Sequence, residues 1–255
     1  MFYMLISCLQ KRAKPAIKAG ILSLPATAWA LLLAGETALA QEPASFTHAN
    51  FVTGDRSMQS LVEFPDIDVD VQVDVTCSGI ATAKGRLKEA FCSAPNDPDL
   101  EFTMAVSRRF NSSRMVPATV DGKPEEVDFQ FIVSFRKVGD NETISVYPNN
   151  GKNVDRLGLD YYSAQRYSPH VWPNRCGTAT REDLVLEMAI IDAAGRPREV
   201  NIMTAEARLA ATCRARLITQ LEDGRWIPAS YNGEFVESVW VSPIVLSRIG
   251  YKRQQ

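Results

Sequence analysis

The segment Arg225–Phe235 reads RWIPASYNGEF, and the segment Arg114–Pro124 reads RMVPATVDGKP. Each has Arg, two apolar residues, Pro-Ala, two further residues and then Asn or Asp before Gly. Asn-Gly and Asp-Gly are the strongest short signals for a two-residue β-hairpin turn. Because the same combination occurs twice, the sequence predicts one structural unit that is present in two copies.

A second kind of hairpin precedes each of these segments. Residues 68–77 alternate between polar and apolar side chains, which is typical of a half-buried strand. This strand leads to Thr-Ala-Lys-Gly-Arg at 82–86, and the second half has Asp-Ala-Ala-Gly-Arg at 192–196. Gly85 and Gly195 can take the positive φ that a three-residue hairpin loop requires.

The loop length also predicts the register of the second hairpin. It places Met188 opposite Val200 and Leu186 opposite Ile202. Apolar residues would then share one face of the hairpin, as a sheet with one buried face requires.

One amphipathic helix is expected after each hairpin. In the first, Asp97 would be the N-cap and Pro98 the first helical residue, and in the second Thr204 would be the N-cap and Gly224 the end. Apolar residues recur every four positions in both helices: Phe102, Val106 and Phe110 in the first, and Leu209, Cys213, Leu217 and Leu221 in the second. Each helix thus has one apolar stripe to bury against its hairpin.

Short strands at 115–120 and 226–231 are predicted before the Asp-Gly and Asn-Gly turns, and closing strands at 127–135 and 236–246 after them. The prolines within the two short strands lack an amide hydrogen, so these strands belong at a sheet edge or at an irregular start. Met115, Trp226 and Trp240 are expected to fill the cores. The sequence therefore predicts an α+β fold of two small domains, each with a β-hairpin, one amphipathic helix and a further antiparallel strand.

The first forty residues differ from the rest of the chain. A basic patch precedes an apolar stretch at 19–35, and residues 38–40 (Ala-Leu-Ala) match the small-x-small pattern of a cleavage site. We expect residues 1–40 to be a cleaved signal peptide for export to the periplasm, with no membrane insertion afterwards. The alternative is an uncleaved inner-membrane anchor that faces the periplasm.

The charge of the chain argues against nucleic acid as a partner. The formal net charge is −2, and removal of the leader with its four basic residues and Glu36 would change it to −5. No basic stripe is present that would attract phosphates.

The rest of the chain divides into four segments. We interpret the polar, irregular residues 41–60 as a flexible lead-in and residues 61–137 as the first domain. Residues 138–180 are rich in Tyr, Asn and Gly and form a linker or a partly ordered strap, and residues 181–250 form the second domain.

Four cysteines follow the leader, an even number that favours disulfides in an exported chain. A bond between Cys77 and Cys92 would close the first hairpin, although the three-residue loop places Cys77 opposite Phe91, so the bond requires a bulge or a shorter turn. Cys213 bonds to Cys176 or is simply a small buried residue. With no Cys-x-x-Cys pair, we predict no metal site.

The sequence offers little support for catalysis. His48 lies in the lead-in and His170 in the strap, neither is near a nucleophile motif, and both are interpreted as solvated. The carboxylates of Asp66, Asp68, Asp70 and Asp74 are evenly spaced, which favours the outer face of a strand over a calcium loop. We therefore predict no catalytic residue, no cofactor and no enzyme activity.

The order of a Gly-turn hairpin, an amphipathic helix, Arg-x-x-Pro-Ala, Asp/Asn-Gly and a closing strand resembles the carboxy-terminal domain of TonB energy transducers. The resemblance covers residues 68–135 and 183–246. It implies structural roles for the motif residues, which are Gly85, Pro117, Ala118 and Gly122 in the first copy and Gly195, Pro228, Ala229 and Gly233 in the second. It also implies the habit of pairing an exposed strand edge with a partner's peptide.

The resemblance predicts a periplasmic, non-enzymatic protein that binds an envelope protein or peptide by strand pairing, with an outer-membrane transporter as one candidate partner. Alternatively, the two copies pack on each other and satisfy their edges internally. A membrane-anchored energy transducer is another alternative. A further one is an envelope hydrolase with Asp155, Asp160 and His170 of the strap as its groups.

Overall fold

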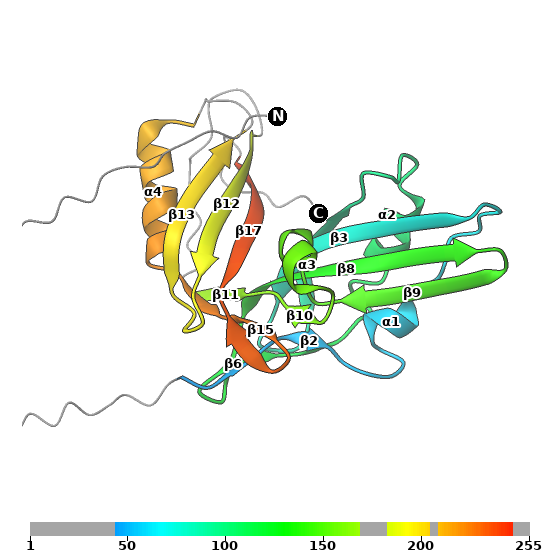
Figure 1. Cartoon of the computed structure of the whole chain (residues 1–255), viewed down its shortest axis with the longest axis horizontal. Helices are drawn as coiled ribbons and strands as arrows, with labels where there is room; N and C mark the ends of the chain where they lie inside the picture. The colour runs from blue at the N-terminus through cyan, green and yellow to red at the C-terminus, as the bar shows by residue number, and fades with distance from the viewer. Residues whose placement is uncertain (1–43, 169–182, 205–208, 247–255) are drawn as a thin grey trace, which may run out of the picture. The chain divides into compact units, whose positions relative to one another are not determined.

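The computed structural model describes residues 44–168, 183–204 and 209–246, which all belong to one compact unit, residues 42–255 (Figure 1). They form several small, antiparallel sheets with few helices, in agreement with the predicted α+β class. None of the described helices is both long and apolar enough to cross a bilayer. The predicted signal peptide, residues 1–40, lies outside the described residues.

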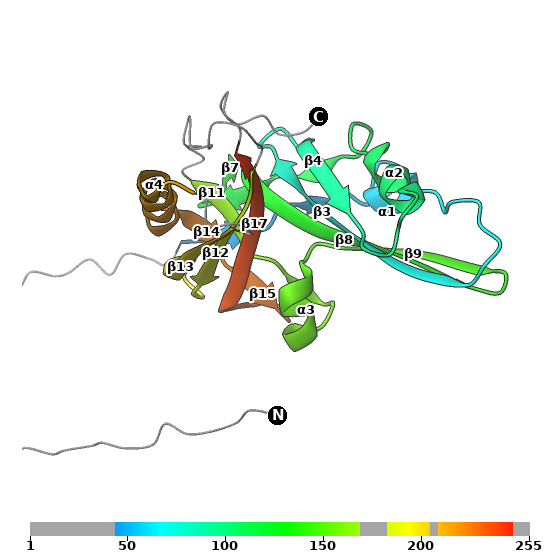
Figure 2. The ribbon, with the colours of Figure 1, turned by 90° about the horizontal axis from the view of Figure 1, so that it is seen from above.

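Two larger sheets dominate the fold, with strand orders β4-β3-β8-β9 and β13-β12-β17 (Figure 2). Their strands are β3 (Val71–Ala81), β4 (Leu87–Ser93), β8 (Val127–Val138), β9 (Asn141–Tyr147), β12 (Asp183–Ile191), β13 (Pro197–Thr204) and β17 (Ser238–Leu246). In both sheets the first hairpin strand lies in the middle, between its hairpin partner and the closing strand. Among the described residues, the second sheet has no counterpart of β9.

The Pro-Ala segments are irregular, as the prolines predict. Each segment is a broken strand followed by a short return strand: β5 (Met115–Val116), β6 (Ala118–Val120) and β7 (Lys123–Glu125), and later β14 (Arg225–Ile227), β15 (Ala229–Tyr231) and β16 (Glu234–Val236). Pro117 and Pro228 separate the two pieces because they have no N–H to continue the ladder. The chain therefore changes its pairing partner at each proline.

The turns after these segments are left-handed at both central residues. Asp121 and Gly122 have φ of 51° and 73°, and Asn232 and Gly233 have φ of 52° and 82°. Two positive φ values are the mark of the type I′ turn, whose twist matches that of the flanking strands. The hairpin signal in the sequence is thus confirmed at both places.

Two short strands pair with the broken strand in each half. In the first half they are β1 (Phe46–Thr47), which pairs with β6, and β2 (Asn50–Phe51), which pairs with β5. In the second half they are β10 (Tyr161–Tyr162), which pairs with β15, and β11 (Gln165–Ser168), which pairs with β14. We call residues 44–147 the first repeat and residues 161–246 the second repeat, because the same elements pair in the same way in both.

The prediction of a flexible lead-in at 41–60 is wrong for its described part. Besides β1 and β2, this part holds helix α1 (Met58–Leu61), and Ala49 and Met58 are fully buried. The partners of β1 and β2 lie some 65 to 75 residues further along the chain. Pairing over this distance leaves no periodic signal in a segment of two-residue strands.

The strap also contains regular structure in its described part. It supplies β9 to the first sheet, helix α3 (Gly151–Leu157), and β10 and β11 to the second repeat. The strap thus has regular structure up to Ser168, and the rest of it lies outside the described residues.

The register of the second hairpin differs from the prediction by one residue. Met188 pairs with Asn201 and Ala189 with Val200, because the ladder shifts between Ile190 and Ile191. A bulge at Arg198 explains the shift, since an extra residue on one strand moves every later side chain to the other face.

Both helices begin later than predicted. Helix α2 (Glu101–Ser107) follows Leu100, and the carboxylate of Asp97 still accepts the N–H of Phe102 at 3.4 Å and of Thr103 at 2.7 Å. Helix α4 (Ala211–Glu222) follows Ala210, so Thr204 is not its cap but the last residue of β13. The central residues of the predicted apolar stripes are nevertheless buried, with Phe102 and Val106 on α2, and Cys213, Leu217 and Leu221 on α4, whereas Phe110 and Leu209 lie outside the two helices.

Each repeat has its own hydrophobic core. The first core centres on Phe129, Phe131 and Phe135, which are fully buried. The second core centres on Trp226 and Trp240, with ring centroids 5.4 Å apart. The predicted core positions of Trp226, Trp240 and Met115 are confirmed.

Candidate functional site

Strand edges are the natural candidate site, because their backbone N–H and C=O groups can pair with another chain. The edge of β9 is covered from within the molecule by Gln59 of α1. The Gln59 carboxamide donates to the carbonyl of Ile144 at 2.5 Å and accepts the N–H of Val146 at 3.1 Å. One side chain thus bonds two outward backbone groups of β9, the carbonyl of Ile144 and the N–H of Val146.

The edge of β17 is covered in the same manner by the strap. Asn153 of α3 donates to the carbonyl of Val239 at 2.6 Å and accepts its N–H at 3.2 Å. Gln130 of β8 donates to the carbonyl of Val241. The next outward position is Pro243, which has no N–H to offer.

A fourth carboxamide joins the two repeats. Gln165 of β11 accepts the N–H of Ala49 at 2.8 Å and donates to its carbonyl at 3.0 Å, and the Gln165 side chain is 1 % exposed. Asn50 also donates to the Tyr162 hydroxyl at 3.3 Å. The loop between β1 and β2 is therefore bonded to the second repeat through its backbone.

Two outer edges remain, those of β4 and β13. The β4 ladder is interrupted opposite Gly79, where Glu89 has φ of 48° and forms a bulge. A Cβ on Gly79 would lie 2.8 Å from the Ala90 Cβ, so only Gly allows this bulge. Bulges of this kind disrupt an edge for a further strand.

The β13 edge is open at Val200. Antiparallel bonding alternates along a strand. The backbone N–H and C=O of Val239 point away from β12, because they bond Asn153. Ile190, the residue of β12 opposite Val239, therefore directs its own N–H and C=O to β13. Val200 and Ile202 of β13 therefore face outward. The Ile202 N–H is bonded to the Asn201 side chain at 2.8 Å, whereas no side chain of the described residues bonds the N–H or C=O of Val200.

The second repeat contains a buried ion pair next to this sheet. Arg166 Nη1 lies 3.3 Å from a carboxylate oxygen of Glu187, and their side chains are 4 % and 1 % exposed. Arg166 also donates to the carbonyl of Gln220 at 2.8 Å, and its guanidinium lies 5.4 Å from the Trp226 ring centroid and 5.9 Å from that of Trp240. Burial raises the pKa of Glu187 to about 7, and the Arg166 charge opposes this shift.

The predicted bond between Cys77 and Cys92 is confirmed, with a Cα–Cα distance of 4.1 Å. The bulge at Glu89 resolves the conflict with the three-residue loop, because it places Cys92 opposite Cys77 and Phe91 opposite Ser78. Cys213 is buried at 5 % exposure, and its predicted partner Cys176 lies outside the described residues.

Removing the bond is expected to destabilise the first repeat. The double variant Cys77→Ala/Cys92→Ala should lower the free energy of unfolding by about 3 kcal/mol, since the bond closes a loop with a sequence separation of 15. Urea titration with and without reductant measures the effect. A wild-type midpoint equal to that of the variant under oxidising conditions would contradict this expectation.

The prediction that His48 is solvated is wrong. His48 is partly buried, and its Nε2 lies 2.8 Å from the carbonyl oxygen of Pro228. Its ring lies 5.5 Å from that of Tyr162 and 6.2 Å from that of Phe235. Burial lowers the pKa of His48 from 6.5 to about 4, and the bond to Pro228 opposes this shift.

The lowered pKa predicts a pH dependence. Between pH 6.5 and 4 the unfolded chain binds a proton at His48 that the folded chain does not, so this contribution to stability is lost as the pH falls. The loss should be about 1–3 kcal/mol. The raised pKa of Glu187 acts with the opposite sign, so the difference between wild type and His48→Gln isolates the histidine. Urea titrations measure the free energy of unfolding of both proteins across this pH range. If it changed equally with pH in wild type and His48→Gln, the contribution of His48 would be refuted.

The residues of the family motif take equivalent positions in the two repeats. Gly85 and Gly195 have φ of 69° and 77°, and their carbonyls accept the N–H of Met115 at 3.0 Å and of Trp226 at 3.1 Å. The two motif alanines are fully buried. These contacts hold each Pro-Ala segment against the Gly turn of its own hairpin, which is a structural role.

Of the groups named for a hydrolase, Asp155 and Asp160 are exposed, and His170 lies outside the described ranges. Asp66, Asp68, Asp70 and Asp74 are exposed, and the described residues contain no cluster that could hold a metal ion.

The sequence reasoning missed Gln59, Gln130, Asn153 and Gln165, four carboxamides that bond backbone groups. Their sequence contexts carry no motif, because each bonds a segment that is distant along the chain. Asn153 and Gln165 are buried in a segment without apolar periodicity, where a carboxamide needs partners, whereas Gln59 is exposed and gives no such signal.

Asn153 can be tested as the cover of the β17 edge. Replacing Asn153 by Ala leaves the Val239 N–H and C=O without their partner, and stability should fall by about 2 kcal/mol. The Val239 amide should also exchange with solvent faster. Asn111→Ala, at an exposed Asn outside the sheets, is the matched control. Unchanged Val239 exchange in Asn153→Ala would show that the carboxamide does not protect this edge.

Comparison with known proteins finds no match: no family model, no curated protein and no solved structure matches this chain. The resemblance to the TonB carboxy-terminal domain therefore stays a prediction from the motif residues.

Proposed function

We propose that this chain is an exported, non-enzymatic protein of two TonB carboxy-terminal-like domains, which binds an extended segment of an envelope protein by pairing it with the β13 edge. The open Val200 position is the observation that carries this proposal. Two further facts support the fold assignment: both Pro-Ala segments follow a helix, and both bond the Gly turn of the preceding hairpin.

The choice of β13 follows from the state of the other edges. The edges of β9 and β17 are bonded by side chains, β17 carries Pro243, and β4 carries a bulge. Of the two closing strands, β8 lies inside its sheet, and β17 is bonded by Asn153 and Gln130, so both are poor acceptors. On β13, an incoming strand would bond Val200 through both backbone groups and Ile202 through its carbonyl.

A peptide library displayed on phage, selected against the disulfide-intact protein, supplies ligands for the test. Selected peptides are resynthesised with N-methyl groups at one position at a time. Because only alternate residues of a strand face its partner, methylation at alternate positions should weaken binding at least tenfold and methylation between them should not. Equal effects at all positions would exclude strand pairing.

A proline variant then locates the edge. Val200→Pro removes the outward N–H of β13 without removing a ladder bond, and it should weaken peptide binding at least tenfold. Val241→Pro is the matched control, because it changes an outward position on the covered β17 edge, where Pro243 already shows that proline is accepted. If Val200→Pro binds as wild type, or both variants lose binding equally, the β13 assignment is wrong.

A further inference from the structure

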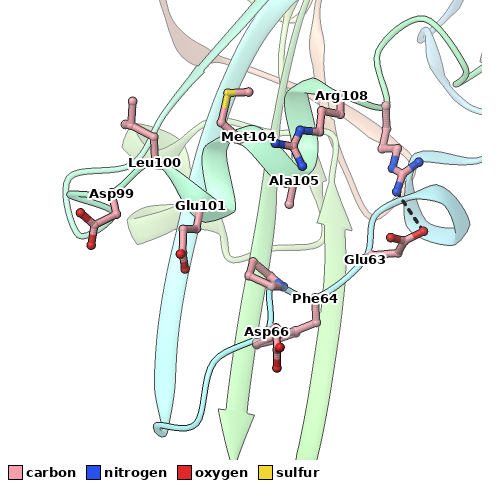
Figure 3. Close-up of a pocket in the computed structure, with 11 residues that line it drawn as sticks. Glu63, Phe64, Asp66, Asp99, Leu100, Glu101, Met104, Ala105 and Arg108 are labelled. Atoms are coloured by element: carbon pink, nitrogen blue, oxygen red, sulfur yellow. Dashed lines mark ion pairs between the residues drawn. The ribbon is translucent and has the colours of Figure 1, made fainter.

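A groove of about 410 Å³ lies between the connector Glu63–Asp66 and helix α2 in the first repeat (Figure 3). None of its lining residues lies on β13 or on another strand. Grooves of a few hundred cubic ångströms are the size at which small ligands and peptide side chains are held.

Two large apolar side chains that line this groove are exposed. Leu100 and Met104 are 53 % and 43 % exposed, although both are large apolar side chains. Leu100 has φ of 59°, a conformation that non-Gly residues seldom adopt, and it directly precedes α2. The backbone therefore holds a leucine outward at a position that Gly would occupy with less strain. Neighbouring exposed apolar side chains mark an interaction surface.

The charges of the groove are unevenly distributed. Glu63 is paired with Arg109 at 2.9 Å. Asp66, Asp99 and Glu101 lie away from this pair in Figure 3, and no salt bridge to them is found among the described residues. The four carboxylates of the groove outnumber its two guanidinium groups, so the surface has a net charge of −2.

We propose that this groove binds a peptide segment of a partner protein in which a Lys or Arg adjoins an aliphatic residue. The aliphatic side chain would cover Leu100 and Met104, and the cation would lie among Asp66, Asp99 and Glu101. Charge complementarity identifies the occupant: an acidic segment would be repelled at the carboxylate end, and a purely apolar one would leave these charges without a partner. The binding goes beyond strand pairing, because it needs no free backbone edge.

The probe is the peptide acetyl-Ala-Lys-Leu-Lys-Ala-amide, and the readout is the chemical shift of the ¹³C-labelled Met104 methyl group. We expect a saturable shift that weakens as salt is raised, since exposed charges are screened. The peptide acetyl-Ala-Glu-Leu-Glu-Ala-amide should give no saturable shift. Absence of a shift with the Lys peptide, or an equal shift with both peptides, would overturn the proposal.

Two variants separate the contribution of the charged side chains to binding from that of the apolar side chains. Asp99→Asn/Glu101→Gln should weaken the Lys peptide at least fivefold, whereas Asp55→Asn/Glu234→Gln removes the same charge at exposed sites elsewhere and should not. Leu100→Gly removes the apolar side chain at a residue whose positive φ suits Gly, so it should reduce binding while stability is kept. Binding that is unchanged in Leu100→Gly, or reduced equally by both charge variants, would contradict the assigned contacts. The outcome is independent of the β13 experiments, which measure a different surface.

Discussion

Replacing Arg166 by Met is expected to lower the free energy of unfolding by about 3–5 kcal/mol, because Glu187 would remain buried without its partner. The carbonyl of Gln220 would also lose a charged donor. Urea unfolding followed by tryptophan fluorescence measures the effect directly, since Trp226 and Trp240 adjoin the guanidinium.

The pH identifies the cause of this loss. Without Arg166 the pKa of Glu187 rises above its value of about 7, so the carboxyl is neutral at pH 5.5 and charged at higher pH. A group whose folded pKa is raised loses its stabilising contribution as the pH rises through that pKa. The loss in Arg166→Met should therefore be smaller at pH 5.5 than at pH 8.

Two comparisons complete this experiment. Arg198→Met breaks an exposed pair with Glu237, whose side chains are 64 % and 50 % exposed, and it should cost less than about 1 kcal/mol. Arg166→Met/Glu187→Leu replaces the whole pair by apolar side chains and should regain most of the loss. A double variant as unstable as the single one would show that the buried charge is not the cause.

The first repeat has an apolar side chain at the position equivalent to Arg166. Phe51 lies opposite Met115 as Arg166 lies opposite Trp226. The Phe51 ring packs on Phe129 at 5.4 Å between centroids, instead of pairing with a carboxylate. If β2 paired with the second repeat, Phe51 would be buried beside Glu187. If β11 paired with the first repeat, Arg166 would be buried without a carboxylate partner. We infer that the pair helps each strand to select its own repeat.

The second large effect is expected at Gly195. A Cβ at this position would lie 2.0 Å from the carbonyl oxygen of Trp226, and the residue has φ of 77°. Gly195→Ala should therefore cost about 4 kcal/mol or more, because it adds a backbone clash to an unfavourable φ. Thermal unfolding of the purified variant measures it. Gly85→Ala should behave alike, since its Cβ would lie 2.5 Å from the Met115 carbonyl oxygen.

Gly233→Ala is the control that separates the clash from the φ effect. Gly233 has φ of 82°, but a Cβ there would meet nothing within 4 Å. This variant should cost only about 1 kcal/mol. Similar losses in Gly195→Ala and Gly233→Ala would contradict the close packing of the Gly turn against the Pro-Ala segment.

Local signals predicted the elements that have local causes. The Asp-Gly and Asn-Gly turns and the Gly loops of the hairpins lie where the sequence placed them, and so do the central residues of the apolar stripes of α2 and α4. These features depend on φ preferences and on contacts within a few residues. The register of the second hairpin failed because the Arg198 bulge has no sequence signature of its own.

The candidate site depends on distant contacts, so the sequence predicted strand pairing without identifying the edge. Asn153 and Gln130, for example, reach β17 from other parts of the chain. His48 was likewise interpreted as solvated because its partner, Pro228, is 180 residues away. The open position on β13 became apparent only from the side-chain bonds on β9 and β17 and the bulge on β4, the other outer strands of the two larger sheets.

Amide hydrogen exchange of the native protein tests the central claim most directly. Val239 and Val146 have their N–H groups bonded to Asn153 and Gln59, whereas the N–H of Val200 faces outward. The account expects slow exchange at Val239 and Val146, fast exchange at Val200, and slowing at Val200 alone when a selected peptide is bound. Slow exchange at Val200 in the free protein, or peptide protection at Val239 instead, would contradict it.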